Sequence, residues 1–262
     1  MIDSRAVRPV MVPGMLSTVT HVRKDDALRF IVCLLILLIP GLALAGPALP
    51  SQDADWAVQQ DSDGIVVETA DLPGSDFQAF RASTTFDVPV SRVMAVMAHP
   101  QSCMKWVHNC TAARNLSGTF RDRFAYSVND MPWPVSDRDY VLHVLTRGEP
   151  GSGTVEVRMS AVKGHHPKQD GMVRVTKSDT LYRFTPVGNG QTRMTWVQHT
   201  EPNGSIPSWL VNSLLVDIPF QSVKALRDVV HEPRYAGHRL VFHNGKLTNV
   251  VKRPDDSGDD AS

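Results

Sequence analysis

Apolar and polar residues alternate with a period of two along most of the chain from residue 64 onward, which is the pattern of half-buried β-strands. Two such segments, residues 64–72 and 77–88, flank a Pro-Gly turn. Six more segments follow between residues 111 and 202, each bounded by Gly, Pro, Asn or Asp. This spacing predicts an antiparallel meander rather than parallel strands joined by helices.

The period changes to that of an α-helix in two places. Residues 89–100 carry an apolar stripe between two prolines, which predicts a short helix. Residues 205–233 predict a long helix with a broad apolar face. Pro219 lies inside this second helix and has no backbone N–H to donate, so we expect the helix to kink or restart there.

The order of these elements predicts an α+β fold. A sheet with this many strands must curl to cover its own apolar face, and the long helix must bury its apolar face as well. A curved antiparallel sheet wrapped around the C-terminal helix satisfies both requirements.

The start of the chain has the pattern of a secretory signal peptide. Residues 30–45 form an apolar run without charge, preceded by the basic residues Lys24 and Arg29. The small residues Ala43 and Ala45 match the cleavage site of a signal peptidase. The pattern therefore predicts a signal peptide over residues 1–45. A retained membrane anchor and a cytosolic protein with an unusual start are the alternatives. The run is shorter than the roughly 20 residues of a membrane span.

Export predicts a protein of the periplasm, with the extracellular space as an alternative.

Residues 46–54 then form a linker, and Trp56 is expected to open a short helix. We place one domain at residues 55–232. Residues 233–262 form a C-terminal extension that ends in an acidic, disordered tail.

Charge excludes one class of partner. The chain carries 27 Lys and Arg against 27 Asp and Glu, and residues 1–45 hold five of the former and three of the latter. The remainder therefore has 22 against 24, a formal charge of −2. Nucleic-acid binding needs a basic excess, so no nucleic-acid partner is expected.

Two cysteines remain beyond the apolar run, Cys103 and Cys110. An even pair in an exported protein predicts a disulfide, with two buried free thiols as the alternative. The bridge would close a loop of eight residues, for which the chain-entropy model gives roughly 2.5 kcal/mol.

Motifs of common enzymes are absent from the sequence. It contains no nucleophile elbow, zinc-protease helix, P-loop or dinucleotide-binding glycine pattern. His165 and His166 lie in a polar turn, with His199 as a third histidine from a distant strand. We expect these histidines to belong to a turn and a strand rather than to a metal site, and we expect no cofactor.

Two longer motifs carry a resemblance to a known family. They are "PWPVSDRDYV" at residues 132–141 and "GSIPSWLVN" at residues 204–212. With the strands between them, the chain from residue 55 to 230 resembles the steroidogenic acute regulatory protein-related lipid transfer (START) family. The resemblance implies a helix-grip fold, in which a curved sheet and a long C-terminal helix enclose a lipid-sized tunnel. Two departures are the apparent export and Tyr182, where the family has tryptophan.

Strand alternation and the helical stripe together select the side chains that would line an apolar cavity of several hundred Å3. The expected lining residues are Tyr140, Leu142, Val144, Val157, Met159, Met194, Trp196, Leu210, Leu214 and Ile218. The same residues would instead fill a core if the cavity were absent.

Polar anchors for a ligand are expected at Arg138, Asp139, His143 and His199. Arg138 has the planar, bidentate chemistry to bind a headgroup, or a carboxylate of a neighbouring strand that would lock the corner. Pro132 and Pro134 make this corner stiff.

The resemblance therefore predicts a non-enzymatic, monomeric protein that binds, and transfers, a lipid or another apolar small molecule, with transient membrane contact. An enzyme on the same scaffold, such as a polyketide cyclase or aromatase, is one alternative. A ligand-free envelope interaction module is the other.

Overall fold

The computed structural model describes residues 49–254. The expected signal peptide, the first residues of the linker and residues 255–262 of the acidic tail lie outside the described residues. Among those that are described, no helix combines the length and the hydropathy of a membrane span.

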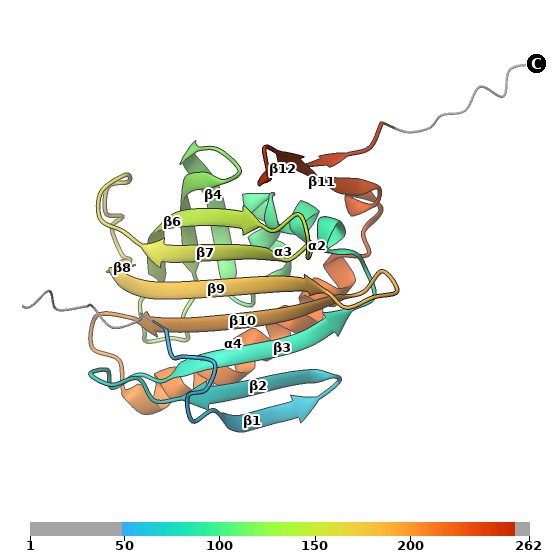
Figure 1. Ribbon diagram of the computed structural model, residues 1–262. Helices are drawn as coiled ribbons and strands as arrows, with labels where there is room; N and C mark the ends of the chain where they lie inside the picture. Colours follow the sequence, from blue (N-terminus) through green and yellow to red (C-terminus); the bar gives the residue numbers. More distant parts are fainter. Residues whose placement is uncertain (1–48, 255–262) are drawn as a thin grey trace, which may run out of the picture. The chain divides into compact units, whose positions relative to one another are not determined.

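One large antiparallel sheet dominates the domain (Figure 1), with the strand order β1-β2-β3-β10-β9-β7-β6-β5-β4. Short β8 pairs with β6 in parallel. The strands are β1 (Ala57–Ser62), β2 (Ile65–Ala70), β3 (Ala79–Phe86), β4 (Cys110–Gly118), β5 (Asp122–Asn129), β6 (Arg138–Gly148), β7 (Val155–Ala161), β8 (Val173–Val175), β9 (Lys177–Pro186) and β10 (Thr192–Glu201). The predicted meander is confirmed from β4 to β10.

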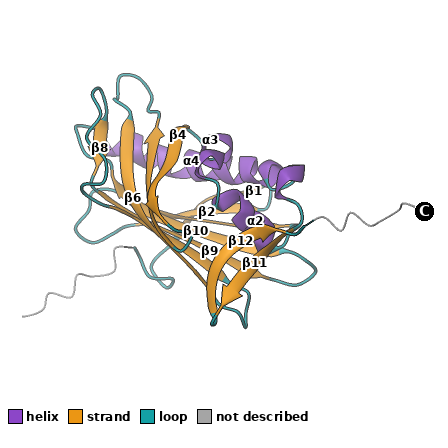
Figure 2. Ribbon diagram, turned by 90° about the horizontal axis from the view of Figure 1, so that it is seen from above, coloured by secondary structure: helices purple, strands orange, loops and turns teal. Residues whose placement is uncertain are grey.

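Helices cover one face of this sheet (Figure 2). They are α2 (Val90–Met97), α3 (Cys103–Trp106) and α4 (Ser208–Val229), with the 3-10 turns η1 (Pro100–Ser102) and η2 (Pro233–Tyr235). α4 packs against β2, β3 and α3, and its buried residues Val223 and Leu226 join the main core. The predicted helix-grip architecture is confirmed.

Two local predictions were wrong or incomplete. The segment after Trp56 is not a helix, because residues 57–62 form β1 and pair with β2 through a turn at Asp63 and Gly64. Both turn residues have positive φ, 54° and 66°, as a tight hairpin requires. α4 runs through Pro219 as one helix from 208 to 229 rather than restarting there.

The C-terminal extension contains a hairpin that the sequence interpretation did not identify. Strands β11 (His238–His243) and β12 (Lys246–Lys252) pair with each other and pack against α2. Leu247 is 1% exposed and Val250 9%, and both belong to the main core. The hairpin therefore completes the domain rather than extending from it.

Candidate functional site

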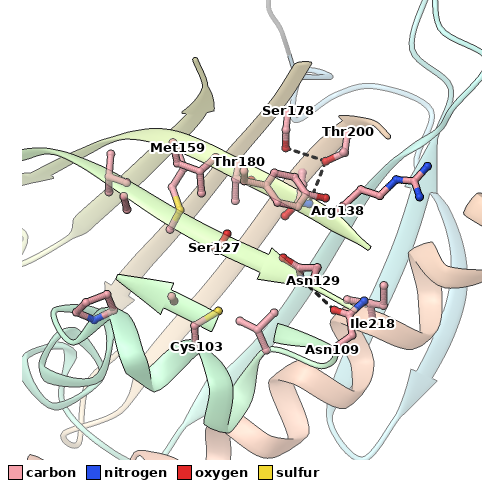
Figure 3. Close-up of a pocket in the computed structure, with 18 of the residues that line it drawn as sticks. Cys103, Asn109, Ser127, Asn129, Arg138, Met159, Ser178, Thr180, Thr200 and Ile218 are labelled. Atoms are coloured by element: carbon pink, nitrogen blue, oxygen red, sulfur yellow. Dashed lines mark hydrogen bonds between the residues drawn. The ribbon is translucent and has the colours of Figure 1, made fainter. Parts of the chain in front are cut away.

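A cavity of about 240 Å3 lies between the inner face of the sheet and the helices α3 and α4. Its wall is formed by side chains of β3 to β7, β9 and β10, the corner before β6, and the first half of α4. Figure 3 shows Met159, Cys103 and Ile218 around this space, from the sheet, α3 and α4 respectively. The cavity is therefore enclosed by the two elements that the helix-grip brings together.

Seven of the ten expected lining residues border this cavity. They are Tyr140, Leu142, Val144, Met159, Trp196, Leu214 and Ile218. The first five come from the alternating inner positions of β6, β7 and β10, and the last two are one helical turn apart on α4. The alternation thus identified the correct face of each strand.

Three expected lining residues do not border the cavity. Val157 and Met194 point to the same side of the sheet but are 1% and 0% exposed, because they lie further along their strands, where the main core is packed. Leu210 is half-buried in the first turn of α4. Alternation gives the face of a strand but not the point along it at which the cavity ends.

Arg138 borders the cavity, but its partners differ from those expected. Its guanidinium donates from Nε to the carbonyl of Pro202 at 3.1 Å and from Nη2 to that of Asn203 at 2.7 Å, and from Nη1 to the carbonyl of Ser136. It makes no ion pair with a carboxylate within the described residues. Arg138 therefore ties the corner before β6 to the loop before α4 through backbone carbonyls.

Asp139 faces the opposite side of the sheet from Arg138 and does not border the cavity. Its carboxylate accepts two hydrogen bonds from Arg174, at 2.9 Å and 2.7 Å, and one from the Tyr126 hydroxyl at 3.1 Å. The hydrogen bond to Asp139 raises the pKa of Arg174. This buried pair stabilises the outer face, so Asp139 is not placed as a headgroup ligand.

The two strand histidines also lie away from the cavity. His143 stacks on Phe124, with ring centroids 4.9 Å apart, and its Nε2 lies 2.8 Å from the Asp122 carboxylate. His199 is buried with its Nε2 3.1 Å from the Ser75 hydroxyl, and burial lowers its pKa. Neither contacts the space that a ligand would occupy.

The histidine turn also lies on the outer side. His165 stacks on Phe124 with ring centroids 3.6 Å apart, and His166 lies 3.2 Å from a guanidinium nitrogen of Arg114. Neither histidine shares a cluster of three metal-binding side chains within residues 49–254.

The START domain family model matches residues 50–234. The chain belongs to the START family. An uncharacterized protein of Pseudomonas aeruginosa is 35% identical over 205 residues, which are 78% of this chain and the full length of the relative.

Solved structures agree with this START assignment. The STAR-related lipid transfer protein of Xanthomonas axonopodis is 31% identical, with a TM-score of 0.63, over 68% of this chain and 99% of that fragment. Human STARD10 has the same TM-score, 0.63, at 16% identity, over 82% of each chain, and this likeness shows the fold alone.

A line of hydrogen-bonded polar groups in the START cavity was not predicted. Trp196 Nε1 donates to Gln198 Oε1 at 3.2 Å, and Gln198 Nε2 donates to Thr200 Oγ1 at 3.1 Å. Ser178 continues the line, with its hydroxyl 2.8 Å from that of Thr200 (Figure 3). These residues occupy alternate positions of β9 and β10, so the same alternation that identified Trp196 would have indicated them.

A second polar group lies near α4. Asn129 donates to Asn109 Oδ1 at 3.0 Å, and Figure 3 shows this pair beside Ile218. Tyr140 also borders the cavity, and burial raises the pKa of its hydroxyl to about 12, so it stays protonated and able to donate. The cavity thus combines apolar walls with a few fixed hydrogen-bonding groups, as small-molecule sites do.

The groups that acid–base catalysis needs are scarce in this lining. Of the 33 residues that border the cavity, none is Asp or Glu, and one, His99, is a histidine. General acid–base chemistry uses two groups positioned on the reacting atoms. Within the described residues the lining therefore holds no carboxylate, and His99 is its one imidazole.

The predicted disulfide between Cys103 and Cys110 is confirmed. It joins the start of α3 to the start of β4, and Cys103 borders the cavity. Trp106, inside the loop that the bridge closes, packs edge-on against Tyr182 and Trp196 with ring centroids 6.1 Å apart in both cases. The bridge therefore holds the short helix that covers one side of the cavity.

Proposed function

We propose that this START protein binds a lipid or another apolar small molecule in its cavity, as a monomer and without catalysing a reaction. The observation that carries the proposal is the cavity itself, about 240 Å3, with mostly apolar walls and no carboxylate. The relative from Xanthomonas axonopodis, described as a lipid transfer protein, supports the same ligand class.

The size of the cavity limits the ligand. Sites for drug-sized ligands span roughly 300–1,000 Å3, and this cavity falls just below that range. A molecule with a single slender chain therefore fits better than a lipid with two full acyl chains.

The protein acts outside the cytoplasm in this proposal, in the periplasm or, as the alternative, the extracellular space. Two features support export. The apolar run at residues 30–45 has the pattern of a signal peptide, and Cys103 and Cys110 form a disulfide, which persists in oxidising compartments.

Transfer, as opposed to binding alone, needs contact with a membrane. Trp133 in the corner before β6 is 92% exposed, and Trp209 in the first turn of α4 is 71% exposed. Each lies two residues from a residue of the cavity lining, Met131 and Val211 respectively. We propose that these tryptophans contact the bilayer next to the entrance of the cavity, since tryptophan favours the membrane interface.

The entrance would then open by movement at the start of α4. The loop before this helix is fixed at Asn203, whose side-chain amide donates to the Arg174 carbonyl and the Thr176 hydroxyl, both at 2.9 Å. The segment that moves to open the cavity would therefore begin after Gly204. Pro219 would be the hinge about which the first half of α4 moves.

Native mass spectrometry tests the binding proposal. The protein with its export signal is purified without detergent, weighed, and then extracted with organic solvent. We expect a monomer with one lipid-like molecule bound. Ala125→Trp, which fills the cavity, should lose this adduct, whereas the matched control Ala57→Trp on exposed β1 should keep it.

Two results would contradict the proposal. An apo mass together with no uptake of a fluorescent lipid would favour a ligand-free envelope module. An adduct that is chemically converted during incubation would favour an enzyme on this scaffold.

A further inference from the structure

Arg123 is a buried cation on the wall of the cavity. It occupies an inner position of β5, opposite Val144 of β6, and is 9% exposed. Its neighbour Asp122 points to the other face, where it contacts His143. Arg123 therefore belongs to the side of the sheet that faces the cavity.

The hydrogen bonds of Arg123 leave part of its guanidinium free. Nη1 donates to the carbonyl of Phe120 at 2.8 Å and to the hydroxyl of Thr146 at 3.3 Å. Nε and Nη2 have no partner within residues 49–254, and no carboxylate there lies within 4.0 Å of the guanidinium. Arg138, by contrast, donates from all three of its nitrogens to carbonyls.

The free nitrogens of Arg123 are not sealed inside the protein. In the described part of the chain, three residues have a fully buried polar side-chain atom without a hydrogen-bond partner. They are Arg121, Asn212 and Tyr235, and Arg123 is not among them. Arg123 borders the cavity, so the cavity is a space from which a ligand could reach these N–H groups.

An uncompensated buried charge is costly. Removing a guanidinium from water is strongly unfavourable unless a partner of opposite charge compensates. Burial alone lowers the pKa of Arg123, and no carboxylate offsets that effect. Within residues 49–254 the lining supplies no Asp or Glu, so an anionic ligand would provide the missing counter-charge.

We infer that the ligand of this cavity is a single-chain amphiphile with an oxyanion headgroup, and that Arg123 binds that headgroup. A carboxylate or a phosphate monoester accepts two N–H groups of a guanidinium in a bidentate arrangement. The apolar chain would run along Leu142 and Met159 and across α4, and the volume of about 240 Å3 admits one such chain. This inference rests on the proposed function and names its ligand class.

Three ligands with the same chain test the inference on the unmodified protein. Dodecanoate, dodecyl phosphate and 1-dodecanol are titrated while the fluorescence of Trp106 and Trp196, which border the cavity, is recorded. We expect at least one of the two anions to bind at least about tenfold more tightly than the alcohol, equivalent to about 1.4 kcal/mol. The anion that binds more tightly identifies a carboxylate or a phosphate source.

Variants assign the preference to Arg123. Arg123→Met should remove the preference for the anion while leaving the affinity for 1-dodecanol unchanged, and Arg123→Lys should retain part of it. Arg193→Met, at an exposed position of β10, is the matched control and should behave as the unmodified protein. Near-ultraviolet circular dichroism checks that each variant is folded.

The outcomes separate the two proposals. Equal affinity for the alcohol and both anions, or a preference that survives Arg123→Met, would overturn the role of Arg123 and leave the lipid-binding proposal intact. Failure of all three ligands to bind would overturn both. If Arg123→Met does not fold, the three ligands are compared on the unmodified protein and on Arg123→Lys. That comparison still decides whether Arg123 causes the preference for the anion.

Discussion

Arg138 and Asp139 are adjacent in β6, and their side chains lie on opposite faces of the sheet. Arg138 reaches the cavity wall and the loop before α4, whereas Asp139 pairs with Arg174 on the outer face. The motif that contains both residues was expected to supply either ligand contacts or a structural corner with an ion pair. The structure gives Arg138 and Asp139 structural partners. Within residues 49–254, the arginine of the cavity lining with unpaired nitrogens is Arg123 on β5.

Buried His199 makes stability depend on pH. Burial is the largest influence on this group and lowers its pKa, although the carboxylates of Glu201 and Asp179 oppose it. The unfolded chain, with a histidine pKa of about 6.5, therefore takes up the proton first as pH falls. The stability that the neutral imidazole provides is fully present above about pH 6.5 and is lost as pH falls through the folded pKa.

We therefore expect the free energy of unfolding to fall between about pH 7 and pH 5, and to fall less steeply in His199→Gln. Urea denaturation at a series of pH values measures both slopes. Ser75→Ala, which removes the hydroxyl beside His199 but keeps it buried, should retain the slope of the unmodified protein. Identical slopes for His199→Gln and the unmodified protein would refute this assignment.

At the scale of elements, turn chemistry explains both features that the sequence interpretation missed. Asp63 and Gly64 turn β1 into β2, and Asn244 and Gly245 turn β11 into β12, all with positive φ. Asp-Gly and Asn-Gly are the strongest short hairpin signals in a sequence. For the first hairpin the apolar pattern gives no support, because β1 is mostly exposed and carries little apolar alternation.

The C-terminal hairpin is expected to stabilise the whole domain. Leu247 is buried, and a Cβ added at Gly148 of β6 would lie 2.8 Å from its side chain, so the two segments are closely packed. Leu247→Ala should lower the free energy of unfolding by about 2–5 kcal/mol, the usual cost of a buried leucine.

Chemical denaturation measures the free energy of unfolding that Leu247→Ala loses. Lys246→Ala, at an exposed neighbouring position, is the control. A loss in Leu247→Ala as small as that of the control would show that the hairpin is an appendage.

At the scale of the whole molecule, apolar contacts rather than charge should bring the protein to a membrane. Beyond residue 45 the formal charge is −2, and the sequence contains no polybasic block that would attract anionic lipids. Trp133 and Trp209 are the exposed tryptophans on segments that border the cavity.

The double variant Trp133→Ala, Trp209→Ala should reduce association with phosphatidylcholine–phosphatidylglycerol vesicles by roughly 30-fold, equivalent to about 2 kcal/mol of lost apolar burial. Vesicle sedimentation measures the association of each variant with the vesicles. The affinity of the double variant for a soluble cavity ligand should stay unchanged. Val58→Ala, at an exposed position of β1 far along the sheet order, is the control. Association that depends on salt and not on these tryptophans would exclude this docking mode.

The sequence by itself determined the strands from β2 to β10, the long C-terminal helix and the inner face of most strands, because period-two and period-3.6 patterns are local properties. It did not determine β1 or the β11–β12 hairpin. It also predicted the disulfide from an even pair of cysteines, and the structure decided between the bridge and two free thiols.

Only the tertiary structure decided where along the strands the cavity lies. It separated Trp196, which borders the cavity, from Met194, which packs in the core on the same face of the same strand. It also decided that Arg123 has no carboxylate partner among residues 49–254, because charge compensation depends on residues that are distant in sequence.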